Sequence, residues 1–318
     1  IDPQFRELLG QIADPVLLAA LQWGGVPVGG VPELNDPVRV PADEAGYLRA
    51  TDLIFGSVQN GAALAYPLRI LDVHELANDT LGGERVALAN CTLCRSGVLF
   101  SRAIAGRQLD FLTSGLLLNS NKVMVDVQTK TLWQQLTGEA IAGPLSGETL
   151  ERLPLTVTTW EEWSTEHPDT HVLALPDSGG GRGIEGGPTD ESGAAYVGYS
   201  GTTELWFPAL GVPDVFEEKA EVATVEHEGH RLAVEVTALS EAGPTIVELG
   251  SHLVTVVPFE GGARFYLGAA ADLRGALFGE ESLQAGGESL PRLLSGQSFW
   301  FAWYGTFPDT AWWPEVSP

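Results

Sequence analysis

Short runs of alternating apolar and polar residues follow one another through most of the chain from about residue 52. This period of two is typical of β-strands with one buried face. The first two runs, within residues 53–71, flank Asn60-Gly61, a dipeptide that favours a tight β-hairpin turn. Further strands are predicted at residues 84–91, 97–104, 107–113, 122–129, 220–236, 245–250, 252–259 and 263–269. Helical periodicity is scarce, so the pattern predicts an α+β, mainly β protein.

The first fifty residues have a different pattern. Residues 4–23 carry apolar side chains at helical spacing, and Pro15 interrupts them. A connector rich in Gly and Pro follows at residues 24–41. We therefore predict an N-terminal helical or extended segment over residues 1–50. The chain starts at Ile1 without a signal-like segment, which we interpret as a processed or trimmed start.

The chain also resembles itself. Residues 147–170 align without gaps on residues 287–310, and ten of the 24 aligned residues are identical, Trp160 and Trp163 among them. A looser match joins residues 56–71 to residues 224–239. We predict two degenerate β-rich repeats with short helices, packed together, at residues 51–176 and 196–318. Residues 177–195 are rich in Gly and are interpreted as a linker.

The two matches have different offsets, 168 positions for the earlier and 140 for the later. The first repeat therefore contains about 28 residues that the second lacks, within the interval that holds His74 and both cysteines. We expect the first repeat to carry the chemistry and the second to be a scaffold.

Cys91 and Cys94 are the chain's only cysteines and form a CxxC motif. Two thiolates at this spacing can share a metal ion or a disulfide. His74 adds an imidazole, and Met124, the only methionine, adds a thioether that favours copper over zinc. We predict a metal site of Cys91, Cys94, His74 and Met124, with copper first and zinc second, for metal binding or electron transfer.

Two other interpretations of the motif remain. A thiol–disulfide oxidoreductase would use the same cysteines, but no helix follows Cys91 to lower the pKa of its thiol, so this ranks below metal binding. A non-catalytic structural or interaction protein would contain only a small disulfide. Whether the protein is an enzyme stays open. The "HEGH" stretch, residues 227–230, is interpreted as an exposed hairpin turn whose histidines bind nothing.

Charge and hydropathy exclude two classes of binding partner, nucleic acid and the membrane interior. The formal net charge is −25 with only three lysines, a surface that repels nucleic acid and favours solubility. No run of 18 apolar residues exists, so no membrane span is predicted. The small-molecule or redox-protein partner stays unknown.

Several motifs together resemble the domain of unknown function 3179 family. They are residues 56–79, 90–102, 114–147, 160–173 and 298–310, with Thr92 and Val125 as departures from the usual pattern. The resemblance implies no assigned activity. It gathers polar residues near the cysteines, and we expect cofactor contacts from Glu75, Asn119, Ser120 and Asp126. It also implies an extracytoplasmic location, periplasmic or at the cell surface, with the cytoplasm not excluded.

Overall fold

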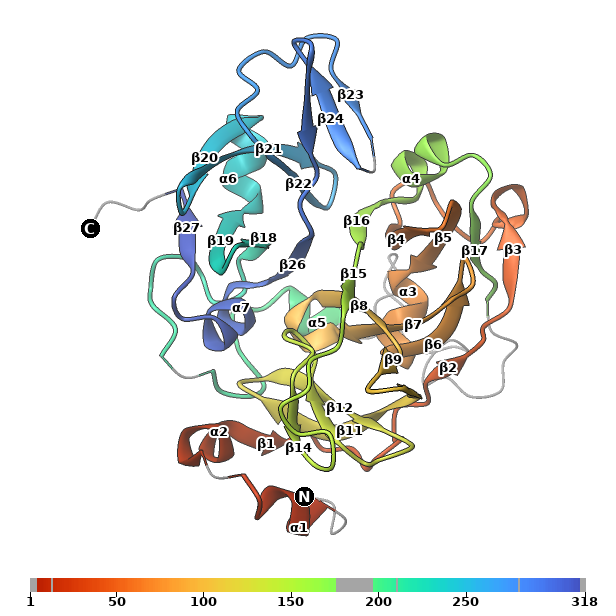
Figure 1. Cartoon of the computed structure of the whole chain (residues 1–318), viewed down its shortest axis with the longest axis vertical. Helices are drawn as coiled ribbons and strands as arrows, with labels where there is room; N and C mark the ends of the chain where they lie inside the picture. The colour runs from red at the N-terminus through yellow and green to blue at the C-terminus, as the bar shows by residue number, and fades with distance from the viewer. Residues whose placement is uncertain (1–4, 13, 176–196, 210, 280, 315–318) are drawn as a thin grey trace.

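The computed structural model describes residues 5–12, 14–175, 197–209, 211–279 and 281–314 (Figure 1). Short strands dominate it and the helices are brief, so the predicted mainly β, α+β class is confirmed. The predicted Gly-rich linker, residues 177–195, lies outside the described residues.

The N-terminal segment contains two helices, α1 (Arg6–Leu9) and α2 (Pro15–Ala20). Pro15 does not simply interrupt a helix. It is the first residue of α2, where its missing N–H costs nothing, and the Asp14 carboxylate accepts from the amide of Val16 to cap that helix. The following residues form strand β1 (Leu21–Trp23).

Three sheets follow. The first pairs, in order, β16 (Thr156–Thr159), β4 (Leu53–Gln59), β5 (Ala62–Pro67), β17 (His171–Leu173) and β3 (Arg39–Pro41). The second pairs β15 (Arg152–Leu153), β8 (Ser96–Ser101), β7 (Glu84–Cys91), β6 (Leu76–Leu81) and β2 (Leu34–Asn35). The third pairs β1 with β11 (Phe111–Leu118), β12 (Asn121–Asp126), β13 (Leu132–Gln134) and β14 (Ala140–Ala142). Strands β9 (Ala103–Ile104) and β10 (Arg107–Gln108) form a separate ribbon.

The C-terminal part contains three smaller sheets, drawn in cyan to blue in Figure 1. One pairs β26 (Ser295–Phe299), β18 (Glu221–His227), β19 (His230–Glu235) and β27 (Ala311–Trp313). The next pairs β20 (Thr245–Leu249), β21 (His252–Phe259) and β22 (Gly262–Leu267), and the last pairs β23 (Leu277–Phe278), β24 (Ser282–Ala285) and β25 (Glu288–Pro291). The remaining helices are η2 (Ala42–Glu44), α3 (Leu68–His74), η3 (Thr92–Cys94), α4 (Trp160–Glu166), α5 (Val197–Ser200), α6 (Val236–Ala242) and α7 (Trp300–Thr306).

Two parts of the chain have the same strand order. We call residues 53–173 the first half and residues 221–313 the second half. The order β16-β4-β5-β17 in the first half matches β26-β18-β19-β27 in the second, with the same parallel or antiparallel sense at every pairing. A seven-residue helix, α3 or α6, follows the second hairpin strand of each. That the halves are repeats of one ancestral unit stays a prediction.

Buried tryptophans occupy the same place in both halves. Trp163 on α4 donates from its indole to Thr170 Oγ1 at 2.9 Å, and Trp303 on α7 donates to Thr310 Oγ1 at 3.0 Å. Both rings are fully or nearly fully buried. The aligned stretches, residues 147–170 and 287–310, therefore build the same helix-to-strand junction.

The predicted second strand of the first hairpin is too long, because helix α3 replaces its end. Residues 68–71 follow the predicted hairpin as an apparent continuation of its second strand, but they begin α3 instead. Pro67 closes strand β5, and Ile70, Leu71 and His74 then lie on the buried side of the helix. A stretch this short with three apolar side chains and Arg69 fits either a strand or a buried helical turn.

One of several apolar clusters spans both halves, and polar side chains also connect them. One apolar cluster contains both cysteines from the first half together with Trp300 and Trp303 from the second. Arg264 of β22, with a nearly buried side chain, donates through both terminal nitrogens to the Glu166 carboxylate at 3.0 and 2.5 Å. Such a bidentate pair holds the two halves in a defined relative position.

Candidate functional site

The cysteine pair lies where β7 turns into β8. Strand β7 ends at Cys91, η3 carries Cys94, and Arg95 takes a left-handed conformation (φ 50°) that returns the chain to β8. The two strands pair Cys91 with Ser96 across the turn. A loop this short directs both sulfurs toward the same point.

The two sulfurs are in contact and hidden from solvent. Their Sγ atoms lie 2.6 Å apart and both cysteines are free thiols. Cys94 is fully buried and Cys91 is 3% exposed. Burial, followed by the hydrogen bond to Cys91 and its charge, raises the pKa of the Cys94 thiol well above its usual value. Cys94 therefore stays protonated at neutral pH unless its proton is removed within the site.

A polar network holds Cys94 from one side. Its thiol donates to the Ser120 carbonyl at 3.2 Å, and the Asn121 amide donates to its sulfur at 3.4 Å. The same amide donates to Gln135 Oε1 at 2.8 Å, and Gln135 in turn donates to the carbonyls of Ala89 and Ser96. This network ties the cysteine loop to β12 and fixes the sulfur's position.

The second half, together with Tyr199 just before it in the chain, holds the loop from the other side. Ser298 on β26 donates its hydroxyl to the Cys94 carbonyl at 3.3 Å. Arg95 forms an ion pair with Glu221 on β18 at 2.9 Å. Tyr199 of α5 packs in the same apolar cluster, and burial, then the neighbouring sulfurs, raises the pKa of its phenol. Movement of the loop therefore requires contacts from both halves to break.

A cavity of about 70 Å³ reaches Cys91 from the N-terminal side. Its walls are mostly apolar, with Leu93 and Leu116 among them, and its charged groups are Glu75 and Lys122. Lys122 is nearly buried and pairs with the Glu75 carboxylate at 2.5 Å while donating to Thr113 Oγ1 at 2.7 Å. Cys91 lines this cavity and Cys94 does not, so the two thiols differ in access.

His74 is buried at the end of α3 and faces a different partner. Its Nδ1 lies 2.8 Å from the Pro32 carbonyl, so Nδ1 carries the proton and Nε2 is left as an acceptor. Within the described residues, Nε2 has no hydrogen-bond partner. The structure does not bring the His74 nitrogens and both sulfurs together within 4.8 Å of one another.

The other predicted residues have defined places. Met124 on β12 is fully buried in the cluster that contains both cysteines. Asp126 accepts from Thr129, Thr131 and the Trp133 indole, which satisfies its carboxylate inside a turn.

Asn119 and Ser120 connect β12 to more distant segments. The Asn119 amide donates to the Gly305 carbonyl at 2.7 Å, and the Ser120 hydroxyl donates to the Phe207 carbonyl at 2.6 Å. Of the predicted set, the structure therefore gathers Cys91, Cys94 and Met124 in one cluster and places Glu75 at the adjoining cavity.

The predicted site residues left out three members of this neighbourhood, Asn121, Lys122 and Gln135. A usable signal existed for Lys122, because it is one of only three lysines and lies in a strand-like run two positions from Met124. A lysine on a buried strand needs an anionic partner, which Glu75 supplies. Gln135 matches the pattern of the family that the motifs resemble, but nothing in the sequence placed it or Asn121 beside the cysteines.

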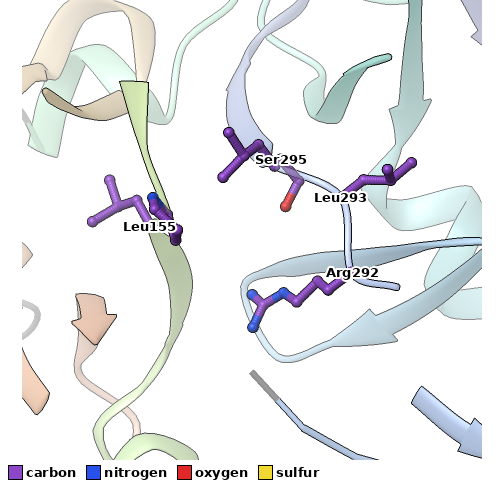
Figure 2. A pocket seen from close by; sticks show the side chains of 6 residues that line it. Leu155, Arg292, Leu293 and Ser295 are labelled. Carbon is purple, nitrogen blue, oxygen red and sulfur yellow. The ribbon is translucent and has the colours of Figure 1, made fainter. Parts of the chain in front are cut away.

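A second cavity lies where the halves meet, and it has little polar chemistry. It measures about 60 Å³ and is lined by Pro154, Leu155 and residues 292–295. Figure 2 shows Leu155 on one side and Arg292, Leu293 and Ser295 on the other. Arg292 donates to Thr156 Oγ1 at 2.6 Å, which ties β16 to the second half. We therefore place the candidate site at the cysteine pair.

No helix among the described residues is long and apolar enough to cross a membrane. The sequence model of the family described as "Protein of unknown function (DUF3179)" matches residues 28–310. Neither the curated proteins nor the solved structures give a match to the chain.

Proposed function

Because the chain belongs to the DUF3179 family, whose description assigns no activity, we propose from its own geometry that Cys91 and Cys94 form a reversible dithiol–disulfide couple. The observation that carries the proposal is the 2.6 Å separation of two free thiols. A disulfide needs about 2.05 Å between its sulfurs, so the bond forms with little movement. By contrast, two thiolates that share a tetrahedral zinc at about 2.3 Å each lie roughly 3.8 Å apart.

The two cysteines differ in how far a reagent from solvent can reach them, and this difference separates the attacking thiol from the resolving thiol. Cys91 lines the cavity and is the thiol that an external disulfide can reach. Cys94 is buried against it and acts as the resolving thiol. The cavity, at about 70 Å³, is several times larger than the about 10–15 Å³ that a single water requires. It therefore suits a small-molecule disulfide rather than a protein loop.

The exchange proceeds in two balanced steps. The Cys91 thiolate attacks one sulfur of the small disulfide, forms a mixed disulfide and releases the other half as a thiolate. The Cys94 sulfur, after losing its proton, attacks Cys91 Sγ and releases the second half as a thiolate. The protein dithiol loses two electrons and two protons, and the substrate disulfide becomes two thiols.

Trapping the mixed disulfide tests this order. The Cys94→Ser variant, treated with 2-hydroxyethyl disulfide, is expected to retain one adduct on Cys91 by intact mass. The matched Cys91→Ser variant, whose remaining thiol is buried, is expected to react at least about tenfold more slowly. Wild-type protein is expected to lose two hydrogens and to regain them with dithiothreitol. Folded wild-type protein that keeps both thiols, or equal reactivity of the two variants, would overturn the proposal.

The metal interpretation is the second candidate, favoured by His74. A histidine whose Nδ1 donates to a backbone carbonyl presents Nε2 as metal ligands do. Metal analysis of protein prepared without chelator separates the two candidates. The redox proposal expects any copper or zinc content to be unchanged by Cys91→Ser and by Cys94→Ser, whereas a near-stoichiometric metal lost in both cysteine variants would replace it. We also propose the extracytoplasmic location, where disulfides persist.

A further inference from the structure

Two hairpin turns meet on the surface of the second half. The turn between β18 and β19 consists of Glu228 and Gly229, and the turn between β20 and β21 consists of Gly250 and Ser251. The His230 ring covers Gly250 so closely that a Cβ there would lie 2.3 Å from the ring. The two turns therefore keep a fixed relative position.

Three of the chain's six histidines gather at these turns. The ligand atoms of His227, Glu228 and His252 all lie within 4.8 Å of one another. His252 Nε2 is 3.0 Å from a Glu228 oxygen, and the His227 and His252 rings have centroids 5.1 Å apart. Among the described residues, no other group of three His, Cys, Asp or Glu side chains converges in this way.

The charge at the turns suits a cation. Glu228 places a carboxylate at the turn, and its side chain is 66% exposed, so an ion from solvent can reach it. The net charge of −25 raises the local concentration of cations around the whole molecule.

We propose that His227, Glu228 and His252 form a binding site for a divalent transition-metal ion of the zinc class. Two imidazoles and one carboxylate are a ligand set that zinc accepts, with a fourth position left for water or an external ligand. Calcium and magnesium prefer oxygen ligands and fit this set poorly. The site is independent of the cysteine chemistry and lies in the other half.

The required movement is small. Ligand atoms bound to zinc at about 2.0–2.2 Å lie roughly 3.4 Å apart in a tetrahedral site. The His252 and Glu228 atoms already lie 3.0 Å apart, so His227 makes most of the approach. The metal replaces the proton shared by His252 and Glu228, and it ties the first turn to the start of β21.

Calorimetric titration with Zn²⁺ tests the site. The parent protein and its variants all carry Cys91→Ser, so that the sulfur pair cannot chelate, and wild-type protein is titrated beside them. We expect one equivalent to bind, and His252→Gln, His227→Gln or Glu228→Gln to weaken binding more than about tenfold each. His171→Gln, an exposed histidine on β17 of the first half, is the matched control and is expected to bind as its parent.

Each other outcome counts against the site. No binding by the parent protein, or binding that survives His252→Gln, overturns the proposal. Binding by wild-type protein that Cys91→Ser abolishes assigns the metal to the cysteine pair instead. Circular dichroism of each variant checks folding, and Co²⁺ absorption gives a second readout. The Co²⁺ spectrum of the parent protein should change when His252 is replaced and stay unchanged when His171 is.

Discussion

Strands β7 and β21 occupy the same place in their halves, yet their reactive side chains lie at opposite ends. Each is an eight-residue strand in the middle of its sheet, and each follows the helix and strand that succeed the first hairpin. The first half places Cys91 at the end of β7, whereas the second places His252 at the start of β21. Strand pairing constrains the framework, while the turns are free to differ in chemistry.

The turns themselves show the difference. Four residues, Thr92 to Arg95, connect β7 to β8, but only Glu260 and Gly261 connect β21 to β22. The two-residue turn cannot hold a CxxC motif. At the other end, the Asn60 amide donates to the Gly82 carbonyl to join two turns of the first half. The His and Glu side chains occupy the corresponding turns of the second half.

The largest expected effect comes from removing an ion pair between the halves. Glu166→Ala removes the carboxylate that pairs with the nearly buried Arg264 guanidinium. We expect the free energy of unfolding to fall by about 3–5 kcal/mol, measured by urea denaturation. The control is Glu161→Ala, an exposed residue on the same helix, which should cost less than about 0.5 kcal/mol. An equal loss in both variants would mean that the ion pair does not join the halves.

A smaller effect tests whether the two helix-to-strand junctions are equivalent. Thr170→Val and Thr310→Val each leave a buried indole N–H without its acceptor. Each should lower the unfolding free energy by about 1–3 kcal/mol. The two values should agree within about 0.5 kcal/mol, and urea midpoints at constant slope provide the comparison. A clear loss in one half and none in the other breaks the equivalence.

The smallest expected change in unfolding free energy comes from giving a turn of the second half the residue found in the first. Glu228 has φ 49°, a left-handed conformation that asparagine adopts more readily, as Asn60 does in the first half. We expect Glu228→Asn to raise the unfolding free energy by up to about 0.5 kcal/mol while it abolishes Zn²⁺ binding. Thermal unfolding with and without Zn²⁺ measures both. A variant that still binds Zn²⁺ would show that the carboxylate is not a ligand.

The strands were the most predictable part of the molecule. The residues predicted at 84–91 are those of β7, and the Asn60-Gly61 turn joins β4 to β5. Local alternation and turn chemistry suffice for such elements. Helix α3 was not predictable in this way, because residues 68–71, with three apolar side chains, fit two conformations until tertiary packing selects one.

The candidate site was only partly predictable. The CxxC spacing indicated that Cys91 and Cys94 meet, because a short loop limits how far apart they can lie. The partners of Cys94 are Ser120, in the turn before β12, and Asn121, the first residue of β12. They lie 26 and 27 positions from Cys94 in the sequence, so no local rule names them.

The cluster of His227, Glu228 and His252 could not be predicted from the sequence for the same reason. Within the "HEGH" stretch the histidines resembled an ordinary exposed turn, and only the packing of a second turn adds the third ligand.

The seal that Ser298 and Glu221 place on the cysteine loop has one more consequence. A reagent in solution reaches Cys94 only after two contacts of the loop have broken, the hydrogen bond from Ser298 and the ion pair with Glu221. Both residues lie in the second half, more than a hundred positions further along the chain. Such an opening belongs to the cooperative, high-energy end of the protein's fluctuations. The labelling rate of Cys94 in the Cys91→Ser variant should thus follow denaturant dependence like that of global unfolding. The rate at which the buried thiol is labelled would therefore report how often the whole fold opens.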